Sequence, residues 1–244
     1  MKASRIDADR RLLLKLAAAA AVAGVLPVRA AAPSSSANIG IIGSGNVGSA
    51  LGRSWIESGH EVMFSSRNLD SDKALAAKLG GKAHAGSPTE AAEFGEAVLI
   101  AVPYGALVDL GQSLGTALNG KIVMDACNPF PARDGEVATR ALEKGAGITS
   151  AELLPGARIV RAFNAIGAAR MGAALDSPGK VGMPIAGDDA QAIELVSRLI
   201  RDVGYEPVLI GGLAMGKYLM PGTPLAGEHT PDEIRDIVAK LKAR

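Results

Sequence analysis

Three glycines near the start of the chain follow a short apolar run, in the stretch IGIIGSGNVGSA. Gly43, Gly45 and Gly48 have the GxGxxG spacing that is typical of a helix opening directly after a strand. In that setting Gly43 permits a tight turn, Gly45 lets the backbone approach a phosphate, and Gly48 lets the helix pack close to the strand. A pyrophosphate could rest on the first helical N–H groups, which have no partner inside the helix. The pattern predicts a dinucleotide site, and a similar turn without a ligand is the alternative.

The end of the second predicted strand carries the motif FSSRN, Phe64 to Asn68. An NAD site would place Asp or Glu about 20 residues after the glycines, where the carboxylate holds the ribose hydroxyls. This motif contains no carboxylate, and Ser66 and Arg67 offer charge-assisted hydrogen bonds to a 2′-phosphate. An exposed arginine that follows a strand is the alternative. The motif therefore favours NADP(H) over NAD(H), and we expect Asn68, its last residue, to take part in cofactor binding.

Short apolar runs alternate with helical patterns along the chain, which predicts a parallel sheet covered by helices on both faces. Predicted helices include 47–58, one that starts at the capping box SPTE at Ser87, and 188–202. The fold class is α/β, a doubly wound and mostly parallel Rossmann-type sheet in a single domain with a short C-terminal helical appendage. The predicted strands are 38–42, 61–65, 82–85, 97–101, 121–125, 158–163, 181–186 and 206–210.

The chain divides into four predicted segments. Residues 1–30 have a basic start, an apolar stretch and small residues near Ala30, as an export signal requires. Within them DRRLLLK resembles the twin-arginine signal, and a general secretory signal is the alternative. We therefore expect a periplasmic or otherwise exported protein that engages the twin-arginine export machinery. Residues 31–37 form a linker, 38–210 an NADP-binding Rossmann-type domain, and 211–244 the helical appendage, whose last helix begins at TPDE.

Charge and residue counts exclude several classes of function. Six of the 26 Lys/Arg and two of the 25 Asp/Glu lie in residues 1–30, which leaves the rest of the chain with a net charge of about −3. No basic patch with interleaved aromatics is present, so we expect no nucleic-acid partner. The three histidines are far apart and have no metal-ligand spacing, so we expect no metal. A homodimer is compatible with the composition.

Ligands of open α/β sheets bind at the carboxyl ends of the strands, and Pro103, Tyr104, Cys127, Asn128 and Asn164 follow predicted strands there. They form no Ser/His/Asp or Cys/His set, so hydrolysis and acyl transfer have no support. Tyr104 is a candidate proton donor, with a packing role as the alternative. Cys127 is expected to be a small buried residue rather than a redox-active one. Hydride transfer needs mainly two rings held in contact in a dry site, which these residues could provide.

The order of five motifs along the chain resembles the NADPH-dependent reductases of the deazaflavin coenzyme F420, over most of residues 38–210. The resemblance implies that Ser44, Asn46 and Val47 line the pyrophosphate turn. It also implies that Ser66 and Arg67 hold the 2′-phosphate. The motifs are GSGNVG, then SSRN, AVPY at 101–104, DACNPF at 125–130 and RAFN at 161–164.

The same resemblance implies that Val102 and Pro103 lie along the nicotinamide ribose, with Asn128 and Asn164 near the nicotinamide ring. In that family the hydride passes directly between the nicotinamide and the deazaflavin, with no side-chain acid or nucleophile. The scaffold is shared with pyrroline-5-carboxylate reductases and ferric reductase domains, so the resemblance leaves the acceptor open.

Two classes of function therefore remain from the sequence. The first is an NADP(H)-dependent oxidoreductase that acts on a flavin, a deazaflavin or another small acceptor, an imine or carbonyl reductase among them. The second is a non-catalytic NADP(H)-binding protein, such as a redox sensor or interaction module, which the lack of a named acid or base favours. Turnover of NADPH with an electron acceptor separates the two.

Overall fold

The computed structural model describes residues 36–243. The predicted export signal and most of the predicted linker lie outside these residues. None of the helices between residues 36 and 243 is long and apolar enough to cross a membrane.

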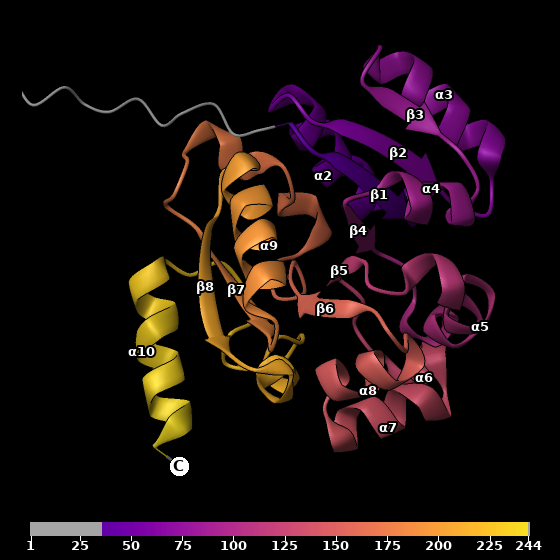
Figure 1. Ribbon diagram of the computed structural model, residues 1–244. Coiled ribbons are helices and arrows are strands. Elements are labelled where there is room, and N and C mark those ends of the chain that lie inside the picture. Colours follow the sequence, from indigo (N-terminus) through magenta and orange to yellow (C-terminus); the bar gives the residue numbers. More distant parts are fainter. Residues whose placement is uncertain (1–35, 244) are drawn as a thin grey trace, which may run out of the picture. The chain divides into compact units, whose positions relative to one another are not determined.

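One eight-stranded sheet runs through the described residues, in the order β3-β2-β1-β4-β5-β6-β7-β8 (Figure 1). Every strand overlaps a predicted one, with ends that differ by at most two residues, so the predicted strand pattern is confirmed. The strands are β1 (Asn38–Ile42), β2 (Glu61–Ser65), β3 (Ala83–Ala85), β4 (Ala97–Ile100), β5 (Ile122–Asp125), β6 (Arg158–Arg161), β7 (Gly182–Gly187) and β8 (Glu206–Gly211).

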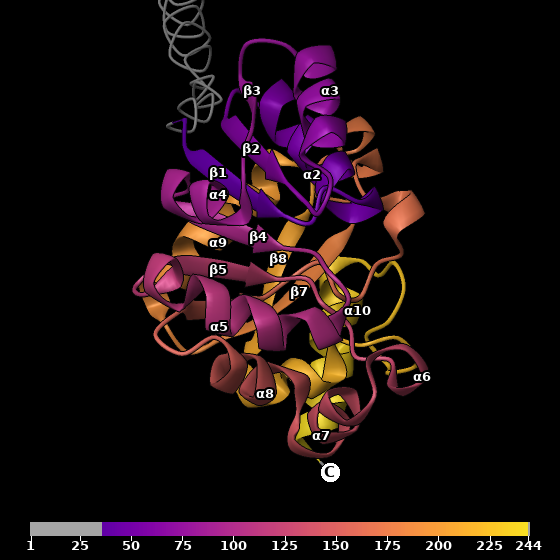
Figure 2. The ribbon, with the colours of Figure 1, turned by 90° about the vertical axis from the view of Figure 1, so that its right-hand side faces the viewer.

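Helices cover both faces of the sheet, which confirms the doubly wound α/β fold. On one face α2 (Asn46–Glu57), α3 (Leu69–Leu79) and α9 (Ala190–Asp202) bury one apolar core. On the other face α4 (Pro88–Phe94), α5 (Leu107–Leu118) and α8 (Ala146–Leu153) bury a second core, and Figure 2 views the sheet from the side of α5. The other helical segments are η1 (Tyr104–Ala106), α6 (Pro131–Asp134), α7 (Glu136–Lys144), η2 (Ala168–Arg170), η3 (Ala173–Asp176), η4 (Leu213–Tyr218) and α10 (Pro231–Lys242).

Local sequence signals account for several helix starts. Ser87 caps α4 and Thr230 caps α10, each in a complete capping box with Pro at the first helical position, as predicted. Two backbone N–H groups that lack a helical partner are thereby satisfied at each start. The apolar residues of α9 face the sheet, and Val196, Leu199 and Ile200 are fully buried.

Parallel pairing aligns the carboxyl ends of five neighbouring strands. Ser65 of β2 pairs with Ile42 of β1, Ile42 with Ile100 of β4, Ile100 with Asp125 of β5, and Asp125 with Arg161 of β6. Because neighbouring strands lie about 4.8 Å apart, these five ends form a row about 19 Å long. The loops that follow the strands therefore meet along one edge of the sheet.

The sheet changes direction after β6. Strand β7 pairs antiparallel to β6, and β8 pairs parallel to β7, so the carboxyl ends of β7 and β8 lie at the opposite edge. A third apolar cluster, which includes Val208 and Ile210 of β8 and Ile234 and Val238 of α10, attaches the C-terminal helix to these two strands (Figure 1).

A buried histidine joins the start of β1 to the end of α9. The Ala37 N–H donates to Nδ1 of His60 at 3.1 Å, so Nε2 carries the proton and donates to Asp202 at 3.1 Å. The His60 side chain is fully buried. Burial lowers the pKa of His60 because the charged imidazolium loses its hydration, and this effect outweighs the attraction of Asp202.

We expect acid to destabilise the protein through His60. Below about pH 6.5 the unfolded chain binds a proton at this histidine that the folded chain does not, so the free energy of unfolding falls as the pH falls through that range. Urea unfolding at pH 7.5 and pH 5.5 should show a smaller pH dependence for His60→Asn than for the wild type, by at most about 1.4 kcal/mol per pH unit. Equal pH dependence in the two proteins would contradict this assignment.

Candidate functional site

The glycine turn has the geometry that the sequence predicts. Gly43 adopts φ +105°, and a Cβ there would lie 2.4 Å from the carbonyl oxygen of Ala101. A Cβ on Gly48 would lie 2.1 Å from the carbonyl oxygen of Gly43, so this glycine allows α2 to pack against the turn. A Cβ on Gly45 would meet no atom within 4 Å, so the space above the turn is open. A ligand can therefore approach the backbone at Gly45.

Helix α2 begins at this open turn without a side-chain cap. Gly45 is the N-cap residue, no side chain accepts from the first helical N–H groups, and the first turn contains no acidic residue. Asn46 is exposed and Val47 is half-buried. The helix start thus offers unpaired N–H donors and a positive dipole end, as a pyrophosphate requires.

The loop after β2 brings Arg67 to the same edge of the sheet. Arg67 is exposed and has no hydrogen bond or ion pair with residues 36–243, so its guanidinium is available to an anion. The Ser66 hydroxyl, which was predicted to hold the 2′-phosphate, donates instead to the carboxylate of Asp72 at 2.8 Å. The FSSRN loop itself contains no carboxylate, but Asp72 of α3, seven residues beyond the end of β2, lies against it.

Val102 and Pro103 follow β4 and lie beside the glycine turn. A Cβ on Gly43 would lie 2.8 Å from Cγ1 of Val102, and Pro103 is exposed. Tyr104 points away from this surface. It is fully buried, and its hydroxyl bonds to the Ala146 carbonyl at 2.9 Å and to the Ser150 hydroxyl at 3.0 Å. Burial raises the pKa of Tyr104, so the structure favours the packing role over that of a proton donor.

A buried ion pair joins the ends of β5 and β6. Arg161 donates to Asp125 at 2.6 Å, and both side chains are fully buried. The second Asp125 oxygen accepts the Cys127 N–H at 2.8 Å, and Arg161 also donates to the Cys127 carbonyl at 3.2 Å. The Cys127 thiol is 1% exposed, and burial raises its pKa, so it is a structural thiol here.

The two asparagines next to this pair are held by their amide nitrogens. The side-chain NH₂ of Asn128 donates to the backbone carbonyl of Asn164 at 2.8 Å, and the side-chain NH₂ of Asn164 donates to the backbone carbonyl of Cys127 at 3.3 Å. The side-chain carbonyl oxygens of both residues are buried and have no partner within the described chain. A buried acceptor without a donor is costly, so these two oxygens are suited to accept hydrogen bonds from a ligand.

Phe163 turns the chain sharply just before Asn164. Its φ is +65°, the one positive φ at a non-glycine residue in the described chain. Such a conformation is strained for a bulky residue and persists only where the surroundings fix it. Trp55 and Tyr205 hold the Phe163 ring in edge-to-face contacts, with ring centroids 6.0 and 6.5 Å away. The aromatic contacts therefore fix the position of Asn164.

An exposed aromatic side chain stands beside Asn128. Phe130 is 42% exposed, and the Arg133 guanidinium lies over its ring, 5.0 Å from the centroid. Arg133 also donates to the backbone carbonyl of Asn128 at 2.9 Å. The Asp134 carboxylate accepts from Arg133 and from the backbone N–H of Phe130. The ring is thus held in place at the surface. No functional role was predicted for Phe130 or Arg133, although the motif DACNPF contains Phe130.

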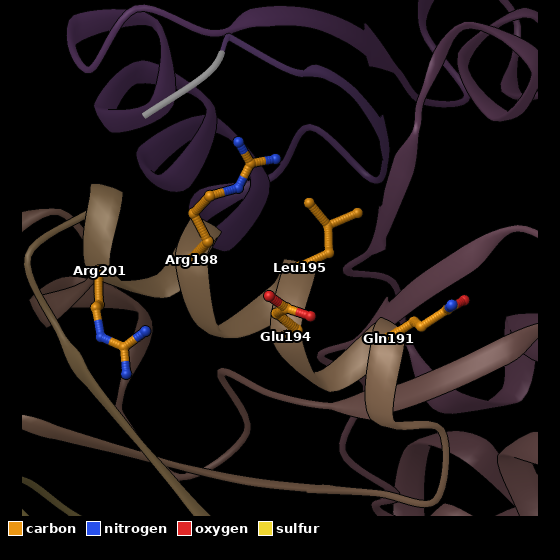
Figure 3. A pocket seen from close by; sticks show the side chains of 5 residues that line it. All are labelled: Gln191, Glu194, Leu195, Arg198 and Arg201. Carbon is orange, nitrogen blue, oxygen red and sulfur yellow. The ribbon is translucent and has the colours of Figure 1, made fainter. Parts of the chain in front are cut away.

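Two hollows of the described surface lie away from this edge. One, of about 400 Å³, follows the exposed face of α9, and Figure 3 shows its five lining side chains spread along the helix, with Arg198 and Arg201 pointing apart. Another, of about 270 Å³, lies between η3 and Tyr205. Neither contains a predicted site residue. Within residues 36–243 no group of three His, Cys, Asp or Glu side chains could hold a metal ion.

Comparison with known sequences gives one consistent family. Residues 38–129 match the family described as NADP oxidoreductase, coenzyme F420-dependent. The F420-dependent NADP reductase of Methanothermobacter marburgensis is 30% identical to the chain over 198 residues, which cover 75% of this chain and 87% of the reductase.

The chain is also similar to a metalloreductase and to a hypothetical protein of known structure. Metalloreductase STEAP3 of Rattus norvegicus is 29% identical over 188 residues, which cover 76% of this chain and 36% of the metalloreductase. The chain thus spans about a third of that relative's length. A crystal structure of a hypothetical protein from Sinorhizobium meliloti superposes with a TM-score of 0.64 at 30% identity, covering 78% of this chain and 93% of that one.

The buried ion pair gives a prediction about stability. Arg161→Met leaves the Asp125 carboxylate buried without its counter-ion, so we expect the free energy of unfolding to fall by about 3–5 kcal/mol. The double variant Asp125→Asn/Arg161→Met, which removes both charges and keeps an acceptor for Cys127, should recover part of this loss. The control is Arg235→Met, which breaks an exposed pair with Asp232 on α10 and should cost at most about 0.5 kcal/mol in urea unfolding. Equal losses for Arg161→Met and the control would contradict the prediction.

Proposed function

This chain belongs to the family of coenzyme F420-dependent NADP oxidoreductases, and on that basis we propose that it transfers a hydride between NADP(H) and a flavin or deazaflavin acceptor. The observation that carries the proposal is the row of strand ends, which brings the glycine turn, Arg67 and the two asparagine oxygens to one edge of the sheet. These groups match the pyrophosphate, the 2′-phosphate and the carboxamide of the cofactor.

The residues at the edge fit an extended dinucleotide. The open start of α2 would bind the pyrophosphate through N–H groups, and the free guanidinium of Arg67 would bind the 2′-phosphate. Val102 and Pro103 lie between these positions and the asparagines, since β4 lies between β1 and β5. The unpaired oxygens of Asn128 and Asn164 would accept the N–H groups of the carboxamide.

The chemistry requires little from side chains. When bound, NADPH would supply a hydride to the acceptor, and the reduced acceptor would take up a proton from solvent after it leaves the site. The chain's part is to orient the two rings and to exclude water, and the buried side chains of Cys127 and Phe163, next to the two asparagines in sequence, provide apolar surroundings for this.

The exposed Phe130 ring supports a planar acceptor. An exposed aromatic ring offers a stacking surface, and the Arg133 guanidinium, whose charge is paired with Asp134, lies over the ring and holds it in place. Reduction of an imine or carbonyl would draw on a nearby proton donor, and both Tyr104 and Cys127 point into the core. A flavin-type ring therefore suits the site better than an imine or a carbonyl. The alternative function, NADP(H) binding without turnover, is tested by the acceptor assay described below.

Replacement of Arg67 tests the cofactor assignment. A guanidinium can make two charge-assisted hydrogen bonds to a 2′-phosphate, each worth about 1.5–3 kcal/mol, whereas NAD offers only a hydroxyl. We expect Arg67→Ala to weaken NADP(H) binding by roughly ten- to a hundredfold and to leave NAD(H) binding nearly unchanged, as measured by calorimetric titration. Lys78→Ala, which removes an exposed cation from the far end of α3, is the control. A parallel loss for both cofactors would show that Arg67 only braces its loop.

Replacement of Phe130 tests the acceptor. We expect the wild type to oxidise NADPH with FMN, FAD or coenzyme F420, and Phe130→Ala to raise the KM for the preferred acceptor by about two- to tenfold, because one stacking contact is lost. NADP(H) affinity should not change. Leu142→Ala truncates an exposed apolar side chain on α7 and should leave both quantities as they are. Tight NADPH binding without turnover of any of these acceptors would favour the non-catalytic alternative.

A further inference from the structure

A buried carboxylate links two segments of the proposed dinucleotide site. Asp72 is 1% exposed in the first turns of α3. It accepts the hydroxyl of Ser66, in the loop after β2, at 2.8 Å, and with its other oxygen the hydroxyl of Ser44, in the glycine turn. Because Asn68 caps α3 and its carbonyl accepts the Asp72 N–H, the helix turns Asp72 back beneath the loop.

These contacts commit the hydroxyl protons that a phosphate would need. A serine hydroxyl has a single proton to donate. Ser44 donates to Asp72, and Ser66 has two acceptors within reach, Asp72 at 2.8 Å and the Asn68 backbone carbonyl at 3.3 Å, of which the carboxylate is the nearer. The Ser66 oxygen also accepts the Asn68 N–H at 3.1 Å. While these contacts hold, neither serine can donate to a 2′-phosphate, so the charge-assisted contact to that group falls to Arg67.

The charge of Asp72 acts in the opposite direction to that of Arg67. A carboxylate in contact with Ser66 repels a phosphate dianion bound at the same loop, and a buried charge is screened less by salt than an exposed one. A ribose hydroxyl carries no charge, so the buried carboxylate does not repel it, and it can donate to the Ser66 oxygen. Asp72 is therefore expected to weaken the binding of NADP(H) and to leave the binding of NAD(H) largely unaffected.

We propose that Asp72 is a specificity-determining residue that limits the NADP(H) preference set by Arg67, so that the site retains affinity for NAD(H). The inference rests on the proposed dinucleotide function. Two groups of opposite charge would thus set the ratio of the NAD(H) to the NADP(H) affinity. The exposed guanidinium of Arg67 attracts the 2′-phosphate, and the buried carboxylate of Asp72 repels it.

Asp72→Asn is the sharpest test, because the amide keeps the size of the side chain and removes the charge. Its carbonyl oxygen can still accept one serine hydroxyl, and its NH₂ donates to the other, whose own proton is then free for a phosphate. We expect the ratio of the NAD(H) to the NADP(H) dissociation constant to rise about tenfold. Asp70→Asn removes an exposed carboxylate two residues away on the same helix and should not change the ratio.

The measurement is titration of both cofactors into the wild type and the variants, with thermal unfolding to confirm that each is folded. If Asp72→Asn does not fold, Asp72→Ala provides the second charge-removing variant, and the ratio should rise in the same direction. An unchanged ratio, or a parallel loss for both cofactors, would overturn the role of Asp72 while the dinucleotide function stands. Failure of the wild type to bind either cofactor would overturn the proposed function instead.

Discussion

The candidate site depends on the buried ion pair between Asp125 and Arg161. These residues are the last of β5 and β6, they face each other across the sheet, and neither reaches water. Removing two charges from water is costly, and the pair persists because each partner has further hydrogen bonds at the Cys127 backbone. The consequence is a fixed path for the two loops that carry Asn128 and Asn164. The apolar cores on either side of the sheet hold the strands, but this pair sets where the loops leave them.

Different interactions dominate at the two ends of the proposed cofactor site. At the asparagine end, shape and hydrogen bonding dominate, because the groups are buried and uncharged. At the Arg67 end, charge dominates, and Arg67 and Asp72 act against each other across one loop. In the proposed binding mode, the rigid sheet edge would recognise the nicotinamide half, and the opposite charges of Arg67 and Asp72 would discriminate between a phosphate and a hydroxyl.

Sequence patterns predicted the sheet and both capping boxes because those features depend on neighbouring residues. Continuous apolar runs such as Ala97–Ile100 and the signals at Ser87 and Thr230 are local. The tight turn at Gly43 and the close packing at Gly48 were predictable for the same reason. Features that depend on residues brought together by folding were not predicted. Asp72 is distant in sequence from Ser44, the burial of Tyr104 depends on α8, and the reversed direction of β7 depends on how the chain crosses the sheet.

The strained backbone at Phe163 has a consequence for the order in which the molecule assembles. Its ring is held by Trp55, on the first helix of the described chain, and by Tyr205, just before the last strand. Contacts between such distant parts of the sequence form slowly, because long loops must close first. We therefore expect the asparagine side of the proposed site to be completed later in folding than the glycine turn, because the contacts around that turn join segments that are closer in sequence.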